Sequence, residues 1–361
     1  MFTQHPTLLI GPSDWDQTRM PKDEFDRRIA ALWAAFPDAS QAIVFGSASR
    51  HAELAYLTNF VPKLEPGIAL LVRTGAPKLL FGGGPNMVGA MKPLTFITDM
   101  APLNALAKLI AGWDSPLLIG GGHMASATRK TIAEATSGTI RDATPHVWSM
   151  MRRKTPIELA AIREACTILD RAAAAIRNAA QAGAGITTAV LAAERAAIEA
   201  RAQDVRTLFS RDGGRTLRPF EALDDTRADP LQVYVAVRRF NYWAEGFTRL
   251  SNAPDEAGEL AKALLRAALA TVKGGTGIGV LADAIASGAS PFQIHPVTQA
   301  AFVSTIGLSL DPPTGDEVFE SGEVYSVRVG LTADAGQHAI VSAMIAVRDD
   351  GNDVLWQSRI A

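Results

Sequence analysis

The sequence predicts an α+β protein of two domains, residues 1–150 and residues 151–361. Three observations predict this architecture. Short apolar runs alternate with helical patterns before residue 150, a long capped helix follows, and the last part of the chain is rich in strands. A chain of 361 residues that is 48% hydrophobic also has enough apolar material for two cores.

The first domain is expected to alternate helices with short buried strands. Apolar side chains recur at helical spacing in residues 23–36, 103–110 and 123–135. Short apolar runs next to turn residues predict strands at residues 42–45, 67–72, 78–81 and 117–119. This alternation is typical of an α/β domain, which we expect to end near Met150.

A long helix opens the second domain. Thr155 can cap this helix, Pro156 suits its first turn, and Glu158 completes a capping box. Cys166, the only cysteine, falls on the apolar face of the helix, so we expect a buried thiol and no intramolecular disulfide. Gly183 supplies the stop signal.

The rest of the second domain separates strands from helices. A helix is expected at residues 187–201, followed by strands at residues 204–210, 231–240 and 242–249. Two more helices, at residues 253–272 and 277–287, precede strands at residues 303–310, 324–330 and 339–347. Because helices separate two sets of antiparallel strands, the arrangement is α+β rather than doubly wound.

Charge and hydropathy narrow the range of partners. The net charge is −2 and the pI is about 6.3, which gives no reason to expect nucleic acid or an anionic membrane as a partner. The first residues lack the basic start and apolar core of a signal peptide, and no run approaches the roughly 18 apolar residues of a membrane helix. We therefore expect a cytoplasmic protein that binds neither nucleic acid nor membrane.

Short motifs that lie in a fixed order suggest a known family. Residues 56–60 read Tyr-Leu-Thr-Asn-Phe, and residues 151–158 read Met-Arg-Arg-Lys-Thr-Pro-Ile-Glu. Further matching segments are residues 242–245, 306–308, 312–313, 321–324 and 347–351. In this order they resemble the creatinase/aminopeptidase P/prolidase superfamily over nearly the whole chain. The resemblance implies a creatinase-like α/β domain followed by a pita-bread domain, and a homodimer.

In that family two aspartates, a histidine and two glutamates bind two divalent metals. The matching positions here hold Tyr234, Glu245, Ser304, Arg328 and Ser342. The register at the second position is open, because an alternative alignment places Gly246 there. A hydroxyl is a poor ligand for a divalent ion, and a guanidinium keeps its proton and repels metal. We therefore predict that the chain binds no metal and no cofactor.

Creatinase shares the fold but works without metal. Its catalytic histidine lies in a loop similar to residues 212–220, which here ends in Pro219-Phe220. A second histidine of the family, after the glycine-leucine turn, is replaced by Asp311. The sequence therefore matches neither the metal-dependent nor the creatinase chemistry of the family.

The altered pocket is predicted to take an anion. Arg328 offers a fork for a carboxylate, and Glu245 could move protons. His295 and His338 are further catalytic candidates, and the remaining candidates bind substrate: Tyr234, Tyr242, Ser304, Asp311, Ser342 and Arg218.

Each candidate also has a plain structural interpretation. Glu245 and Arg328 could form an internal salt bridge that replaces the metals. His295 could be a loop residue, His338 an exposed hairpin residue and Asp311 a turn residue before two prolines. The two tyrosines could be ordinary strand residues, and the arginine-rich loop that contains Arg218 could be solvated.

Two functions follow as hypotheses. The first is a metal-independent, creatinase-like hydrolase that cleaves a non-peptide C–N bond of a small, carboxylate-bearing molecule. The alternative is a non-catalytic relative that binds a small molecule or a protein partner.

Overall fold

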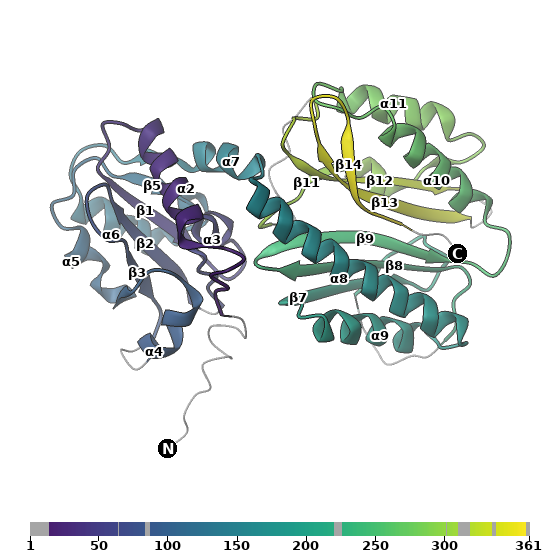
Figure 1. The fold of residues 1–361 in the computed structure, drawn as a ribbon, viewed down its shortest axis with the longest axis horizontal. Helices are drawn as coiled ribbons and strands as arrows, with labels where there is room; N and C mark the ends of the chain where they lie inside the picture. Colours follow the sequence, from purple (N-terminus) through teal and green to yellow (C-terminus); the bar gives the residue numbers. More distant parts are fainter. Residues whose placement is uncertain are drawn as a thin grey trace, which may run out of the picture. The chain divides into compact units, whose positions relative to one another are not determined.

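The computed structural model describes residues 14–63, 65–83, 87–219, 226–300, 302–309, 318–333 and 337–358. The chain divides into two compact units, Met1–Met151 and Arg152–Ala361 (Figure 1). Asp311 and its two following prolines lie outside the described residues. Within the described ranges, no helix is both long enough and apolar enough to cross a membrane.

The first unit contains a mixed six-stranded sheet with strand order β4-β3-β2-β1-β5-β6. Its strands are β1 (Gln41–Gly46), β2 (Gly67–Val72), β3 (Lys78–Phe81), β4 (Asp99–Pro102), β5 (Leu117–Ile119) and β6 (Arg141–Asp142). The strands β1, β2 and β3 pair antiparallel, whereas β4, β5 and β6 each join in parallel. The first domain is therefore mixed, with a β-hairpin at its centre.

Helices flank this sheet. They are α2 (Lys22–Ala35), α3 (Ala52–Thr58), α4 (Val88–Met91), α5 (Leu106–Ile110), α6 (Ser126–Ala135) and α7 (Thr144–Arg152), with 3-10 turns at Lys92–Leu94, Leu103–Ala105 and Gly121–His123. Leu106 and Ile132, from α5 and α6, pack with apolar strand residues in one core. Residues 123–125 are not α-helical as predicted, because a 3-10 turn precedes α6.

The predicted capping box is present at the start of the second unit. In α8 (Pro156–Gln181), the Thr155 hydroxyl accepts a hydrogen bond from the Glu158 backbone amide at 3.2 Å. The Glu158 carboxylate accepts one in return from the Thr155 amide at 3.0 Å. Cys166 is buried on this helix, and burial raises the pKa of its thiol to about 12. The thiol is therefore a packing group and not a reactive thiolate.

The second unit is built from two antiparallel sheets. The first has the order β7-β8-β9, with β7 (Asp204–Ser210), β8 (Leu231–Arg239) and β9 (Tyr242–Leu250). The second has the order β10-β12-β13-β14, and β11 also pairs with β12. Its strands are β10 (Gln293–Ile294), β11 (Val303–Thr305), β12 (Val324–Thr332), β13 (His338–Val347) and β14 (Asn352–Gln357).

A pair of helices covers each sheet on its outer side. The helices α8 and α9 (Ile186–Glu199) pack on β7–β9, and α10 (Glu256–Leu269) packs on β12 and β13 with α11 (Ile278–Gly288) beside it (Figure 1). The short helix α12 (Pro296–Ala300) follows β10. Alternate residues of β12 and β13, such as Val327 and Val341, are buried under α10. The other face of both strands is therefore left for polar groups.

Side chains join the two sheets where β9 runs beside β13. The backbone amide of Phe247 donates to the Ser342 hydroxyl at 3.0 Å, and that of Glu245 donates to the Met344 sulfur at 3.2 Å. From β8, the Gln232 side chain bonds both backbone groups of Ile340 at 3.0 Å. These bonds replace a backbone ladder and satisfy buried polar groups at the junction.

The structure shortens one predicted strand and adds strands that were not predicted, such as β14. Within the described residues, the strand expected over residues 303–310 is present only as β11 (Val303–Thr305), because residues 306–309 form a bend. The edge strand β14 was not predicted, since its alternation is short and follows a turn of two aspartates and a glycine.

Candidate functional site

A buried ion pair lies at the junction of the two sheets. Arg328 on β12 donates from Nη2 to Oε1 of Glu245 on β9, and the exposed fractions of these side chains are 10% and 2%. The hydroxyl of Tyr234 on β8 donates to the other carboxylate oxygen, Oε2. Nη1 of Arg328 donates to the Ser304 hydroxyl at 3.3 Å. We call these four residues the central cluster.

Strand register brings the central cluster together. Tyr234 pairs with Phe247 across β8 and β9, and Glu245 lies two residues before Phe247 on the same face. Arg328 stands directly opposite Ser342 on β13. The sequence left open whether Glu245 or Gly246 occupies the second ligand position, and the strand register places Glu245 in the cluster. Glu245 points into the cluster, while a Cβ on Gly246 would lie 2.1 Å from the Trp356 ring on the opposite face.

Ser342 lies beside the cluster in a structural role. Its hydroxyl accepts from the Phe247 amide, and its own amide donates to the Ser358 hydroxyl at 2.8 Å. The Ser358 hydroxyl in turn donates to the Phe247 carbonyl at 2.6 Å. Sequence reasoning missed both Ser358 and Gln232, because single polar residues in strands carry no signal of such a junction.

The donor set of the cluster does not fit a pair of divalent ions. It offers one carboxylate, two hydroxyls and a guanidinium that is always charged. Among the described residues there is also no group of three or more His, Cys, Asp and Glu side chains that could hold a metal. The fixed cation of Arg328 instead neutralises the buried carboxylate of Glu245, so the cluster is electrically balanced.

One buried hydroxyl near the cluster has no partner. Ser326 lies two residues before Arg328 on the same face of β12, and it pairs with Ser304 across β11 and β12. Its side chain is fully buried, and its hydroxyl makes no hydrogen bond within the described residues. Such groups are rare in folded proteins, so this hydroxyl is an unused hydrogen-bonding group on the same face of β12 as Arg328.

The two candidate histidines lie next to each other, with ring centroids 6.3 Å apart. Nδ1 of His295 accepts from the Val297 amide at 3.2 Å, so Nε2 carries the proton and donates to the Arg215 carbonyl at 3.2 Å. His338 bonds the Thr332 hydroxyl through Nδ1 at 2.6 Å. Burial lowers the pKa of both histidines, so both are neutral near pH 7.

The histidine pair lies along the same face of β12 as the central cluster. Gly330 follows Arg328 by two residues, and a Cβ on Gly330 would lie 2.9 Å from the Cβ of His295. Thr332, the register partner of His338, lies two residues further. At about 3.3 Å per residue, His338 is roughly 13 Å from Arg328 along the strand. His338 therefore belongs to the far end of this polar face, away from Glu245.

The loop after β7 packs over the histidines. Burial raises the pKa of Asp212, but hydrogen bonds from Thr216 and Ser210 outweigh it and hold the pKa at about 2. Arg249, missed by sequence reasoning, forms a two-point ion pair with Asp255 at 2.5 and 2.9 Å and donates to the Gly213 carbonyl. These bonds fix the loop.

Two candidate residues are not brought into the cluster. Tyr242 is buried on the face of β9 opposite to Glu245. Its hydroxyl donates to Glu158, at the start of α8, at 2.8 Å. The side chain of Arg218 is exposed, and its backbone forms a bridge with Phe209 at 2.9 and 3.0 Å. We therefore correct the prediction that Tyr242 and Arg218 line the pocket.

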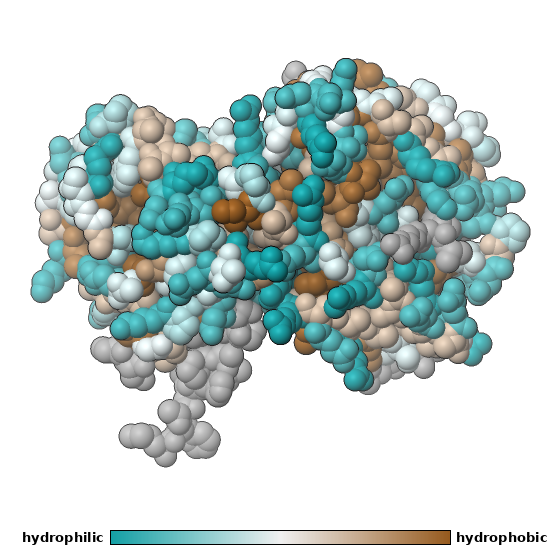
Figure 2. Space-filling model, in the orientation of Figure 1, coloured by the Kyte–Doolittle hydropathy of each residue, from teal (hydrophilic) through white to brown (hydrophobic). Residues whose placement is uncertain are grey.

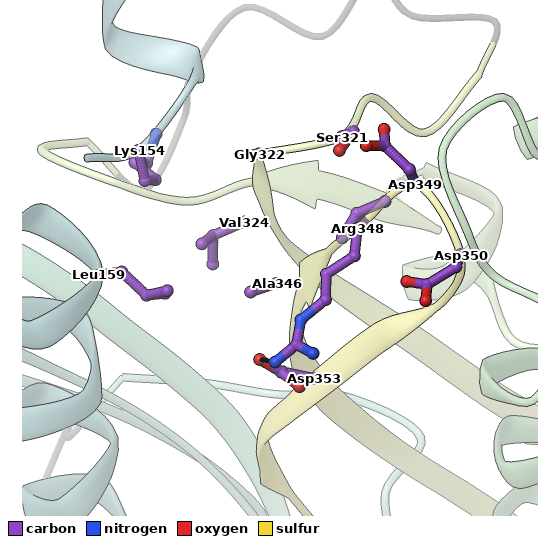
Figure 3. Close-up of a pocket in the computed structure, with 11 residues that line it drawn as sticks. Lys154, Leu159, Ser321, Gly322, Val324, Ala346, Arg348, Asp349, Asp350 and Asp353 are labelled. Carbon is purple, nitrogen blue, oxygen red and sulfur yellow. Dashed lines mark hydrogen bonds and ion pairs between the residues drawn. The ribbon is translucent and has the colours of Figure 1, made fainter. Parts of the chain in front are cut away.

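A cavity of about 630 Å³ lies elsewhere in the second unit, at the turn between β13 and β14 (Figure 3). Val324 and Ala346 form its floor, and they are register partners in β12 and β13. Arg348 lies across it toward Asp353, with which it forms an ion pair. Lys154, from the predicted signature, lines its edge and donates to the Arg152 carbonyl at 3.0 Å. This cavity contains no residue of the central cluster.

These features define a class of fold. Two antiparallel sheets with outer helix pairs and a polar centre form the pita-bread fold, here preceded by an α/β domain, as the sequence predicted. No protein-family model matches the sequence, and no curated protein sequence matches it.

Solved structures match closely over nearly the whole chain. Prolidase from Pyrococcus horikoshii has a TM-score of 0.73 at 12% identity, covering 94% of this chain and 99% of that one. X-Pro aminopeptidase from Thermotoga maritima has a TM-score of 0.74 at 15% identity, covering 93% and 99%. Aminopeptidase P from Escherichia coli has a TM-score of 0.73 at 16% identity, covering 95% of each chain. At such identities the likeness establishes the fold, and the activity has to be argued from the site.

Proposed function

We propose that this protein is a metal-independent hydrolase that cleaves a non-peptide C–N bond in a small molecule bearing a carboxylate. The observation that carries the proposal is the Glu245–Arg328 pair, which lies where the resemblance places metal ligands. The Arg328 guanidinium already binds one carboxylate, that of Glu245. A substrate carboxylate can compete with Glu245 for the same N–H donors. The unpartnered Ser326 hydroxyl beside it offers a further contact.

The chemistry follows from exchange of partners. A substrate carboxylate takes the place of Glu245 on Arg328, and Glu245 keeps its hydrogen bond from Tyr234. The Glu245 oxygen that bonded Arg328 is then free to accept a proton, so the carboxylate can act as a general base. Glu245 then removes a proton from water as the water oxygen bonds to the substrate carbon. The C–N bond breaks, and the leaving nitrogen takes that proton from Glu245.

A second function is favoured by one specific observation. Both carboxylate oxygens of Glu245 already accept hydrogen bonds, and both ring nitrogens of His295 are engaged. A protein with these groups held in place can bind a small acid without turning it over. The second candidate is therefore a non-catalytic relative that binds a small carboxylate-bearing molecule.

The test measures turnover and binding together. Purified protein is incubated with creatine, guanidinoacetate or N-carbamoylglycine, with and without chelator, and released amine or urea is measured by mass spectrometry. We expect turnover that chelator does not change and that Glu245→Gln reduces at least about 100-fold, as loss of a general base does. The exposed-helix variant Glu256→Gln is the matched control.

The outcomes separate the two candidates. Turnover that needs metal would contradict the metal-independent mechanism. Absence of turnover, with a ligand-induced rise in melting temperature that Arg328→Met abolishes, would establish the non-catalytic binder instead. Neither turnover nor a thermal shift would reject both candidates for these acids.

A further inference from the structure

A second cavity, which we call the outer groove, lies beside the edge strand β14 of the second unit, between α8 and α10. It has a volume of about 640 Å³, within the range of small-molecule sites. Three residues of α8, two of α10 and residues 354–358 of β14 and its end line it. Figure 2, in the orientation of Figure 1, shows hydrophobic surface in the region of β14 with hydrophilic surface beside it. The lining of the groove therefore combines apolar side chains with polar and charged ones.

One residue in the lining of the outer groove has a buried donor without a partner. Trp356 is 6% exposed and lines the groove, and its indole Nε1 has no hydrogen-bond partner within the described part of the chain. The benzene edge of the ring packs against Gly246, where an added Cβ would meet it at 2.1 Å. Because this N–H has almost no accessible surface, the indole contributes packing beside the groove and not an accessible donor.

The α10 wall of the groove carries two cations. Lys262 and Arg266 are four residues apart and so lie on one face of the helix. Lys262 lies 3.7 Å from the exposed Glu259, and the Arg266 side chain forms no ion pair within the described residues. Asp170 lies on the α8 side of the groove, so an anionic group is directed toward α10.

The apolar part of the groove is open to a ligand. Val354 on β14 is 48% exposed, one of few large hydrophobic side chains exposed to this extent among the described residues. The Cys166 thiol is neutral, because burial raises its pKa to about 12, and so adds no charge to the groove. Apolar surface of this kind beside two cations is complementary to a molecule with an aromatic or aliphatic body and an acidic head.

We propose that the outer groove is a second binding site, for a small amphipathic anion. The acidic head lies at Lys262 and Arg266, and the apolar body lies on the exposed Val354 side chain. The site is distinct from the central cluster, because Trp356 lies beside Gly246, on the face of β9 opposite to Glu245. It does not depend on the proposed hydrolase activity.

The test uses 1-anilinonaphthalene-8-sulfonate, whose naphthalene ring and sulfonate match this chemistry, with the full chain. We expect saturable binding near one per chain, seen as fluorescence enhancement, and a rise in Kd of about tenfold for the double variant Lys262→Ala/Arg266→Ala. A tenfold rise corresponds to about 1.4 kcal/mol, which the loss of two cations near the surface can account for. Val354→Glu places a negative charge in the lining of the groove and should weaken binding as well.

Two controls make the result decisive. Lys92→Ala/Lys108→Ala removes the same charge in the first unit and should leave Kd unchanged. The neutral analogue N-phenyl-1-naphthylamine should bind equally to the parent protein and the α10 double variant, because it lacks the sulfonate. The proposal is overturned if the anionic probe does not saturate, or if it binds the α10 double variant as tightly as the parent protein.

Discussion

At the scale of single residues, Arg328 changes the character of the molecule's centre. A guanidinium stands where the resemblance places a metal-binding carboxylate, and its positive charge is matched by Glu245 alone among the cluster side chains. Tyr234 and Ser304 complete the hydrogen bonds of this pair. The pair can therefore persist in a buried place, since each charge has a partner and its polar atoms are bonded.

Breaking this pair from one side should be costly. We expect Arg328→Met to lower the free energy of unfolding by about 3–5 kcal/mol, because it leaves the Glu245 carboxylate buried without its cation. The double variant Glu245→Leu/Arg328→Met should recover most of that loss, since both charges are then gone. Urea unfolding measures the cycle. Additive losses in the double variant would show that the two side chains are not coupled.

At the scale of elements, α8 connects the start of the second unit to its first sheet. The capping box holds the first turn, and Glu158 also accepts the hydroxyl of Tyr242 from β9. Tyr242 therefore contributes to the packing of α8 on β9. A residue that looked like a site candidate in the sequence is part of the helix–sheet contact.

Loss of the cap should weaken the whole unit measurably. We expect Thr155→Ala to reduce the free energy of unfolding by about 1 kcal/mol, because the Glu158 amide loses its acceptor. Thr167→Ala, on the exposed face of the same helix, is the control and should change it by less than about 0.5 kcal/mol. Equal effects of the two variants would contradict the role of the cap.

The elements were largely predictable from sequence, whereas the site was only partly so. Local signals fixed α8 and the long strands β8, β9, β12 and β13, because capping and apolar patterns depend on near neighbours. The pairing of Glu245 with Arg328 was foreseen as one alternative, from positions that the resemblance supplied. The places of Tyr242 and His295 were not predictable, since they depend on contacts between segments distant in the chain.

At the scale of the whole molecule, the pita-bread unit keeps its fold with a different balance of charges at its centre. Its charged groups near the histidines are Asp212, Arg215 and Arg249, and all three influence His338. Burial nonetheless dominates, so the neutral forms of His295 and His338 are the native ones. Protonation of either ring in the unfolded chain therefore competes with folding.

Stability should consequently fall in mild acid. The native pKa of each histidine lies below the ordinary 6.5, so the unfolded chain binds more protons once the pH drops below about 6.5. We expect the free energy of unfolding to decrease with falling pH by up to about 1.4 kcal/mol per pH unit for each histidine. Thermal unfolding between about pH 7.5 and 5 checks this.

A variant assigns the effect to one residue. His295→Gln should flatten the slope below about pH 6.5, because glutamine takes up no proton there. A slope unchanged from that of the parent protein would mean that His295 is not held neutral by burial.

The junction of β9 and β13 has a consequence for how this fold can change. Its two halves are held by the side chains of Gln232, Ser342, Met344 and Ser358 rather than by a continuous ladder of peptide groups. Peptide groups are common to every residue type, but these four side chains can each be exchanged by mutation. The strength of the joint between the halves is thus a heritable variable, which descendants of this chain can tighten or loosen one codon at a time.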